Sequence, residues 1–179
     1  RVKTMNRVMD LELTENNLVR VDMGVPELEP AKIPFVAEQR ANLYPIEVDG
    51  VQYDIAAVSM GNPHAVLRVD EVETAPVANL GAQLETHSRF PNRVNVGFMQ
   101  IVDRNQINLR VFERGVGETQ ACGSGACAAA VAALQQGLVD SPVTVHLNGG
   151  DLTIDWQGET EPLLMTGAAA SVFHGRIRI

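Results

Sequence analysis

The chain has 179 residues, of which 22 are acidic and 14 basic, giving a formal net charge of −8. This negative charge argues against nonspecific binding to nucleic acids or anionic membranes, because both require a positively charged surface. Apolar residues make up 45% and charged residues 20%, a balance typical of globular proteins with a sizeable core. No stretch approaches the roughly 18 apolar residues of a membrane-spanning helix. We therefore expect no nucleic-acid or membrane partner, and the two cysteines, interpreted as free thiols in a reducing compartment, favour a cytoplasmic protein.

The first half of the chain is predicted to consist mainly of strands. Alternating apolar residues at 8–13 and 18–23, separated by Glu15-Asn16-Asn17, predict a hairpin. Residues 24–34 contain three prolines and are expected to be irregular. The next hairpin is predicted at 43–58, where Asp49-Gly50 supplies a strong two-residue turn.

The second half combines strands with two predicted helices. Thr74–Leu84 is expected to be helical, with Thr74 as a possible cap and Pro76 in the first turn. Gly123–Leu138 is the clearest helix. The remaining segments are predicted to be strands, namely 65–69, 95–102, 106–112, 143–147, 152–156, 163–165 and 172–179.

The helix predicted at Gly123–Leu138 is apolar on every side, since Ala126–Leu134 contains only alanine, cysteine, valine and leucine. A helix of this kind is buried, and its small side chains allow the surrounding backbone to approach closely. We therefore predict an α+β fold in which antiparallel strands wrap around this central helix.

The two cysteines, Cys122 and Cys127, have different expected roles. Five residues correspond to about 140° around a helix, so the two thiols point in different directions and are not expected to form a disulfide. Cys127 is interpreted as a core residue. The sequence has no cluster with the spacing of a metal site, so we expect no metal.

The segment Glu113–Gly125 is rich in residue types that serve catalysis. Its glycines allow close approach of a ligand, and it leads into the first turn of the buried helix, whose amides form an anion site. A thiol at that position is expected to have a lowered pKa, which would make Cys122 partly thiolate near neutral pH. This combination favours proton abstraction beside a carboxylate. The alternative is that Cys122 is a small buried residue in a glycine-rich cap.

Two further segments carry candidate polar residues. Ser59–His64 contains Asn62 before a proline, followed by His64, and its plainer interpretation is a surface turn with a solvated histidine. Asn95 enters a predicted strand and is a weak signal when taken alone.

Together these segments resemble the diaminopimelate epimerase family. The matching strings are SMGNPHAV at Ser59–Val66, RVNVGFMQ at Arg93–Gln100 and ERGVGETQACGSGACAA at Glu113–Ala129. The likeness runs through all 179 residues, including LVRVDMG and MTGAA, but covers only the later part of the family's chain. The chain also begins at Arg1, so we expect it to be a piece of a longer protein.

The resemblance implies a cofactor-free epimerase that interconverts LL- and meso-diaminopimelate with two bases. One cysteine thiolate removes the α-proton and a second cysteine, on the opposite face, returns one. By motif position, Cys122 is one of these catalytic cysteines. Gly123 and Ser124 are implied to offer backbone amides to the proximal carboxylate of the substrate.

The other family positions are implied to serve the distal end of the substrate and the thiols. Asn62, Asn95 and Arg114 are implied to bind the distal amino-acid end. Glu113 and His64 are implied to lie near the thiols and tune their pKa, with Glu113 also contacting the substrate. An arginine suits this task because its guanidinium binds a carboxylate through two hydrogen bonds.

The family's two-half architecture implies a division of this chain. Residues 1–22 are expected to be strands belonging to the absent N-terminal half, 23–167 the C-terminal epimerase domain, and 168–179 a strand returning to the other half. The opposing base is missing, so the chain alone is expected to be inactive. Its expected partners are diaminopimelate and the N-terminal half, with a homodimer possible because exposed strand edges pair readily.

Three alternatives remain open at this point. The chain could be another cofactor-free racemase, such as a proline racemase relative, although proline has no distal charged end for Arg114, Asn62 and Asn95. It could be a thiol hydrolase in which His64 activates Cys122. It could also be a half-domain that only binds a substrate or a partner chain.

Overall fold

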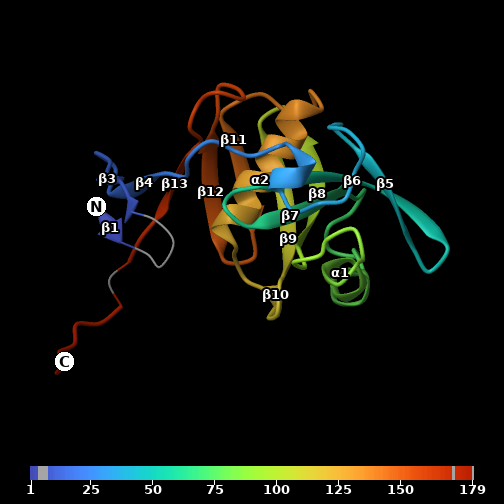
Figure 1. Cartoon of the computed structure of the whole chain (residues 1–179). Helices are drawn as coiled ribbons and strands as arrows, with labels where there is room; N and C mark the ends of the chain where they lie inside the picture. Colours follow the sequence, from blue (N-terminus) through green and yellow to red (C-terminus); the bar gives the residue numbers. More distant parts are fainter. Residues whose placement is uncertain (4–7, 171, 179) are drawn as a thin grey trace.

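Strands dominate the computed structural model, which describes residues 1–3, 8–170 and 172–178 (Figure 1). The strands are β1 (Val2–Lys3), β2 (Val8–Met9), β3 (Leu11–Leu13), β4 (Leu18–Asp22), β5 (Tyr44–Val48), β6 (Val51–Ser59), β7 (Pro63–Arg68), β8 (Asn95–Asp103), β9 (Gln106–Glu113), β10 (Gly117–Thr119), β11 (Val143–Leu147), β12 (Gly150–Asp155) and β13 (Leu164–Ala168). The described residues also form helices α1 (Val77–Glu85) and α2 (Gly123–Gln135) and a 3-10 helix at Pro30–Lys32. This content confirms the predicted combination of helices and strands.

Eleven of the strands form one sheet in the order β3-β4-β13-β12-β11-β9-β8-β7-β6-β5, with β10 paired to β9 beside this path. The expectation of antiparallel strands requires a correction, because β7 pairs parallel with β8 and β9 parallel with β11. A parallel pair needs a crossover connection, and each crossover here contains a helix. Helix α1 connects β7 to β8, and α2 lies in the connection from β9 to β11.

The two predicted hairpins are confirmed. Strands β5 and β6 pair antiparallel around Asp49 and Gly50, whose φ angles of 51° and 78° suit a tight hairpin turn. Strands β3 and β4 also pair antiparallel, and Asn17 in their turn adopts a positive φ of 58°. Asparagine tolerates this conformation better than most residues, which explains its place in the turn.

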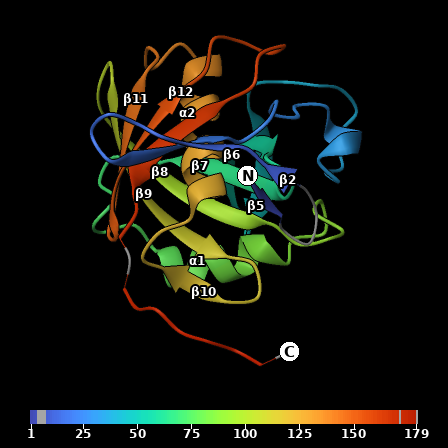
Figure 2. The same cartoon turned by 90° about the vertical axis from the view of Figure 1, so that its left-hand side faces the viewer.

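Strands β6, β7 and β8 are buried because they contribute side chains to two cores. Val58, Val66 and Met99 belong to the core that contains α2. Their strand neighbours Ile55, Ala57, Ala65, Leu67, Val96 and Phe98 belong to a second core with Val77, Leu80 and Leu84 of α1. Successive strand residues point to opposite faces, so the two helices cover opposite faces of this part of the sheet. In Figure 2, α2 lies in the upper part of the view and α1 in the lower part.

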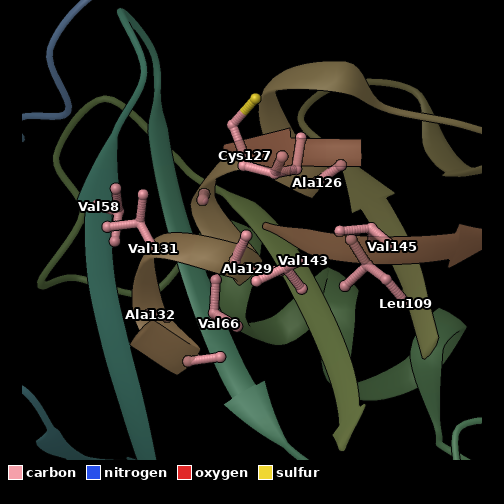
Figure 3. Close-up of a cluster of buried hydrophobic side chains, with 14 of the residues drawn as sticks. Val58, Val66, Leu109, Ala126, Cys127, Ala129, Val131, Ala132, Val143 and Val145 are labelled. Carbon is pink, nitrogen blue, oxygen red and sulfur yellow. The ribbon is translucent and has the colours of Figure 1, made fainter. Parts of the chain in front are cut away.

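Helix α2 packs against strands on one face of the sheet, and its residues from Gly125 to Ala133 are all buried. Figure 3 shows how Ala126, Ala129 and Ala132 lie among valine and leucine side chains from β6, β7, β9 and β11. Cys127 is fully buried in this core, in agreement with its interpretation from the sequence. The alanine-rich composition therefore allows several strands to approach one helix.

The helix ends differ from the predicted ones at both ends of α1, which ends one residue later at Glu85, and at the end of α2. Helix α1 begins at Val77, and Thr74 does not cap it. The Thr74 hydroxyl donates instead to the carbonyl of Glu71 at 3.5 Å. Helix α2 ends at Gln135 rather than Leu138. Gly137 has a φ of +67°, and the amides of Gly137 and Leu138 bond back to Leu134 and Ala133, a common glycine-dependent helix ending.

The C-terminal segment 172–178 forms no strand, in contrast to the prediction for 172–179, whose last residue lies outside the described part. It runs away from the sheet in Figure 1. Val172, Phe173 and Ile177 are each more than four-fifths exposed there. No helix within the described ranges has the length and apolar character needed to cross a membrane.

Candidate active site

Cys122 lies immediately before α2, with an extended backbone that directs the chain into the first helical turn. Its side chain is buried, and its Sγ atom is 3.6 Å from the Ser124 hydroxyl. A Cβ on Gly125 would come within 3.2 Å of both Cβ and Sγ of Cys122. The glycine therefore leaves the space that the thiol occupies.

Ser124 connects the thiol to a buried histidine. Its Oγ atom is 3.6 Å from Cys122 Sγ and 3.1 Å from Nε2 of His64. The same Nε2 atom is 3.2 Å from Oδ1 of Asn62. Because a hydroxyl both donates and accepts hydrogen bonds, Ser124 is able to link the thiol and the imidazole in either direction.

His64 is a neutral imidazole at physiological pH. Burial, with a smaller contribution from the positive charge of Arg114, lowers the pKa of His64 to about 3. The solvated surface histidine considered from the sequence is therefore wrong, since His64 is 1% exposed. It lies on β7, a strand covered on both faces.

The expected lowering of the Cys122 pKa is also wrong. Burial raises the pKa of the Cys122 thiol, and the negative charge of Glu113 and its hydrogen bond act in the same direction. The Ser124 hydroxyl and the Gly125 amide oppose this shift without reversing it. Desolvation thus outweighs the favourable position at the helix start, and Cys122 is a thiol near neutral pH.

Glu113 lies at the end of β9, and its orientation is set by a neighbouring strand. The Thr119 hydroxyl donates a hydrogen bond of 2.6 Å to Oε1 of Glu113. Thr119 belongs to β10, which pairs with β9 so that Gly117 lies opposite Glu113. Gly117 has a φ of +102°, a conformation that glycine adopts without strain and that turns the chain back along β9.

Asn95 joins the His64 strand to the segment that carries Arg114. Its position in β8 is directly paired with His64 of β7. Asn95 is buried, its Nδ2 donates to the carbonyl of Pro63 at 3.1 Å, and its Oδ1 accepts the backbone N–H of Arg114 at 2.9 Å. The Arg114 guanidinium is exposed and donates to the carbonyl of Asn92 at 2.8 Å.

The structure therefore brings the eight candidate residues into one region at the start of α2. Gly123 and Ser124 occupy its first turn, where helix amides lack partners within the helix. Two residues that hydrogen-bond to this region were not among the sequence candidates, namely Thr119, which donates to Glu113, and Glu85, whose Oε1 accepts the backbone N–H of Gly115. Thr119 stands inside the glycine-rich segment Glu113–Gly125, and that position was the available signal.

Among the residues that the structure describes, no group of three or more His, Cys, Asp or Glu side chains is arranged to hold a metal ion.

Comparison with known proteins identifies close relatives. A family model described as diaminopimelate epimerase matches residues 56–172, a range that contains all eight candidates. Diaminopimelate epimerases of Pseudomonas entomophila and Stutzerimonas stutzeri are 59% and 58% identical over all 179 residues. The chain spans 65% of the length of each.

A similar fold occurs in a more distant solved structure. The hydroxyproline epimerase from Agrobacterium vitis, solved with bound trans-4-hydroxy-L-proline, has a TM-score of 0.60 at 17% identity. The match covers 89% of this chain and 52% of that chain. The likeness therefore concerns the fold and includes about half of the longer molecule.

Proposed function

This chain belongs to the diaminopimelate epimerase family, and from that premise we propose that it supplies one side of a two-base epimerisation of diaminopimelate. The observation that carries the proposal is the convergence of Cys122, Ser124, His64 and Glu113 at the start of α2. The α-proton of an amino acid is very weakly acidic, so its removal needs a base held close in a water-poor site. A buried cysteine beside helix amides meets this requirement as the thiolate and returns a proton as the thiol.

Cys122 acts as the acid in the state described here. Its raised pKa keeps the proton on sulfur, and this proton is delivered to the α-carbon while a base on the opposite face removes the original one. After one turnover Cys122 is left as the thiolate, ready to act as base in the reverse direction. Inversion at one carbon without a cofactor requires this exchange of roles.

The two ends of the substrate bind to different parts of the site. The amides of Gly123 and Ser124 hold the proximal carboxylate at the positive end of α2. The Arg114 guanidinium binds the distal carboxylate, and Asn62 and Asn95 serve the same end. A substrate without a second charged end, such as proline, would leave Arg114 unused.

Neither His64 nor Glu113 stabilises the thiolate form of Cys122. Neutral His64 binds the Ser124 hydroxyl without adding a positive charge that would favour the thiolate. Glu113 contributes a negative charge that favours the protonated thiol and also contacts the substrate.

The opposing base belongs to the part of the family's length that this chain does not span. Residues 23–167 then form the epimerase half with α2 as its central helix. Residues 1–22 and 168–179 pack with the other half, a role that fits the exposed apolar side chains near both ends. We also propose that the enzyme is cytoplasmic and that it is able to form a homodimer.

The test is α-proton exchange in deuterated water, followed by proton NMR with LL- and meso-diaminopimelate. We expect the whole enzyme to exchange and epimerise, and this chain alone not to epimerise. Cys122→Ala should abolish epimerisation, whereas Cys127→Ala, a matched change of the other thiol, should retain it. Epimerisation by Cys122→Ala, or by this chain alone, would overturn the proposal.

A further inference from the structure

Three hydrogen bonds from one short segment hold the Arg114-Gly115 step. Oε1 of Glu85 accepts the backbone N–H of Gly115 at 2.7 Å. Oδ1 of Asn95 accepts the backbone N–H of Arg114 at 2.9 Å, and the carbonyl of Asn92 accepts Nη1 of its guanidinium at 2.8 Å. The segment from the end of α1 to the start of β8 therefore determines where this arginine lies.

Glu85 occupies an unfavourable position for a carboxylate. It is the last residue of α1, where the helix dipole disfavours negative charge, and it is 8% exposed. The nearest cation is Arg93, whose Nη1 is 3.5 Å from Oε1 but whose side chain is 60% exposed. The closest donor to this buried acid is the amide of Gly115.

The loop beyond Arg114 depends on such polar anchors. Gly115 has a φ of +75°, so the chain turns sharply at this point. Val116 at the loop tip is 75% exposed and contributes little packing that could fix the loop. Glu85 is brought within reach because α1 packs against β9 and β10, as the two views of the fold also indicate (Figures 1 and 2).

We propose that Glu85 is a positioning residue that holds the Arg114-Gly115 peptide and thereby aims the Arg114 guanidinium at the distal carboxylate of the substrate. This inference rests on the proposed function, because it takes Arg114 as the group that binds that carboxylate. Glu85 itself touches no reacting atom. Its effect is on the affinity for a substrate with two carboxylates and not on proton transfer at Cys122.

The experiment compares Glu85→Leu with Glu85→Gln in the whole enzyme. Leucine removes both oxygens, so we expect KM for diaminopimelate to rise about tenfold with a much smaller change in kcat. Glutamine keeps an acceptor for Gly115 and should restore most of the affinity. Glu38→Leu, the same change at an exposed glutamate, should leave both parameters unchanged.

A double substitution separates positioning from general damage. If Glu85 acts through Arg114, adding Glu85→Leu to Arg114→Lys should raise KM no further. Independent, additive effects would overturn the proposal. Loss of affinity in Arg114→Lys with none in Glu85→Leu would also overturn it, while leaving the proposed function intact. An unchanged KM in Arg114→Lys would instead show that the assignment of Arg114 in the proposed function is wrong, and this inference would fail with it.

A second measurement does not require activity. The Gly115 amide of this chain should be protected from hydrogen exchange, and Glu85→Leu should accelerate its exchange at least about tenfold. The amides of β9 should retain their protection. Equal Gly115 exchange in both proteins would contradict the anchoring role.

Discussion

At the scale of single residues, hydrogen bonds orient the charged groups around Cys122. Glu113 has one carboxylate oxygen held by Thr119, and Ser124 lies between the thiol and His64. These contacts come from four elements, β7, β9, β10 and α2. The neutral state of His64 and the raised pKa of Cys122 both result mainly from burial.

Replacing Thr119 by valine should misplace the Glu113 carboxylate. Valine keeps the shape of threonine but lacks the hydroxyl donor, so Glu113 loses a hydrogen bond to a charged group that contributes about 1.5–3 kcal/mol. We expect kcat/KM of the whole enzyme to fall about tenfold, the rate equivalent of about 1.4 kcal/mol. Thr119→Ser, which retains the hydroxyl, is the control. Equal steady-state kinetics for the two variants would contradict this role.

The pH dependence of alkylation should report the raised pKa of Cys122. In native protein treated with iodoacetamide, the rate at Cys122 should still be increasing above about pH 8.5, the ordinary thiol pKa. Glu113→Gln removes a negative charge and should move the curve to lower pH. Cys127, which is fully buried, should remain unmodified, so Cys122→Ala provides the blank. A plateau near pH 7 would show that the thiol is more acidic than its burial implies.

Thr119 and Glu85 illustrate why part of the site escaped prediction from the sequence. The strings around Cys122, His64 and Asn95 are local and could be recognised by their residue types. The contact of Thr119 requires β10 to fold back onto β9, and that of Glu85 requires α1 to pack beside the same loop. The directions in which the pKa values of His64 and Cys122 shift also depend on burial. The position of Cys122 at the start of a helix does not reveal how deeply the thiol is buried.

At the scale of elements, small residues permit the close packing of both helices. Gly81 in α1 faces Phe112 of β9, and an added Cβ there would lie 2.7 Å from the Cβ and Cγ atoms of Phe112. Gly125 plays a similar part in α2 beside Cys122. These glycines lie inside helices, where their low helix propensity is a cost that close packing offsets.

Gly81→Ala should destabilise the protein although alanine is the better helix former. The gain in helix propensity is about 1 kcal/mol, whereas overpacking against Phe112 costs about 1–3 kcal/mol. The urea midpoint should therefore fall. Asn79→Ala, at an exposed position of the same helix, should leave it nearly unchanged or slightly higher. A higher midpoint for Gly81→Ala would mean that Phe112 moves aside easily.

Local chemistry explains which elements were predicted well. The Asp49-Gly50 turn fixed the β5–β6 hairpin, and the uninterrupted apolar composition of α2 identified a buried helix. The parallel pairs β7–β8 and β9–β11 were not predicted, because the direction of a strand relative to its neighbour depends on long crossover connections. These connections leave no local pattern in the sequence. The start of α1 was missed because a threonine resembles a cap until its actual acceptor is known.

At the scale of the whole molecule, burial of His64 couples stability to pH. The unfolded chain binds a proton at His64 near pH 6.5, whereas the folded chain does so only near pH 3. Between these values the unfolded state holds more protons, so its population is favoured as the pH falls. The contribution to stability is complete above pH 6.5 and is lost progressively towards pH 3.

Urea titrations at several pH values should reveal this coupling. Between pH 6 and 5 we expect the free energy of unfolding to fall by up to about 1.4 kcal/mol per pH unit from this one group. His64→Gln should remove that slope, and the exposed change His174→Gln should not. An identical slope in His64→Gln would show that other groups control the acid sensitivity.

The parallel pairing of β7 with β8 affects the order in which contacts between candidate residues form during folding. His64 and Asn95 meet across this join, so they come together only after the intervening chain, including α1, has looped back over the sheet. Closing such a loop costs entropy before any contact offsets it. A partly folded chain that had formed only its hairpins would therefore lack the contact between His64 and Asn95. The contact between His64 and Asn95 is thus acquired together with the nonlocal step of folding.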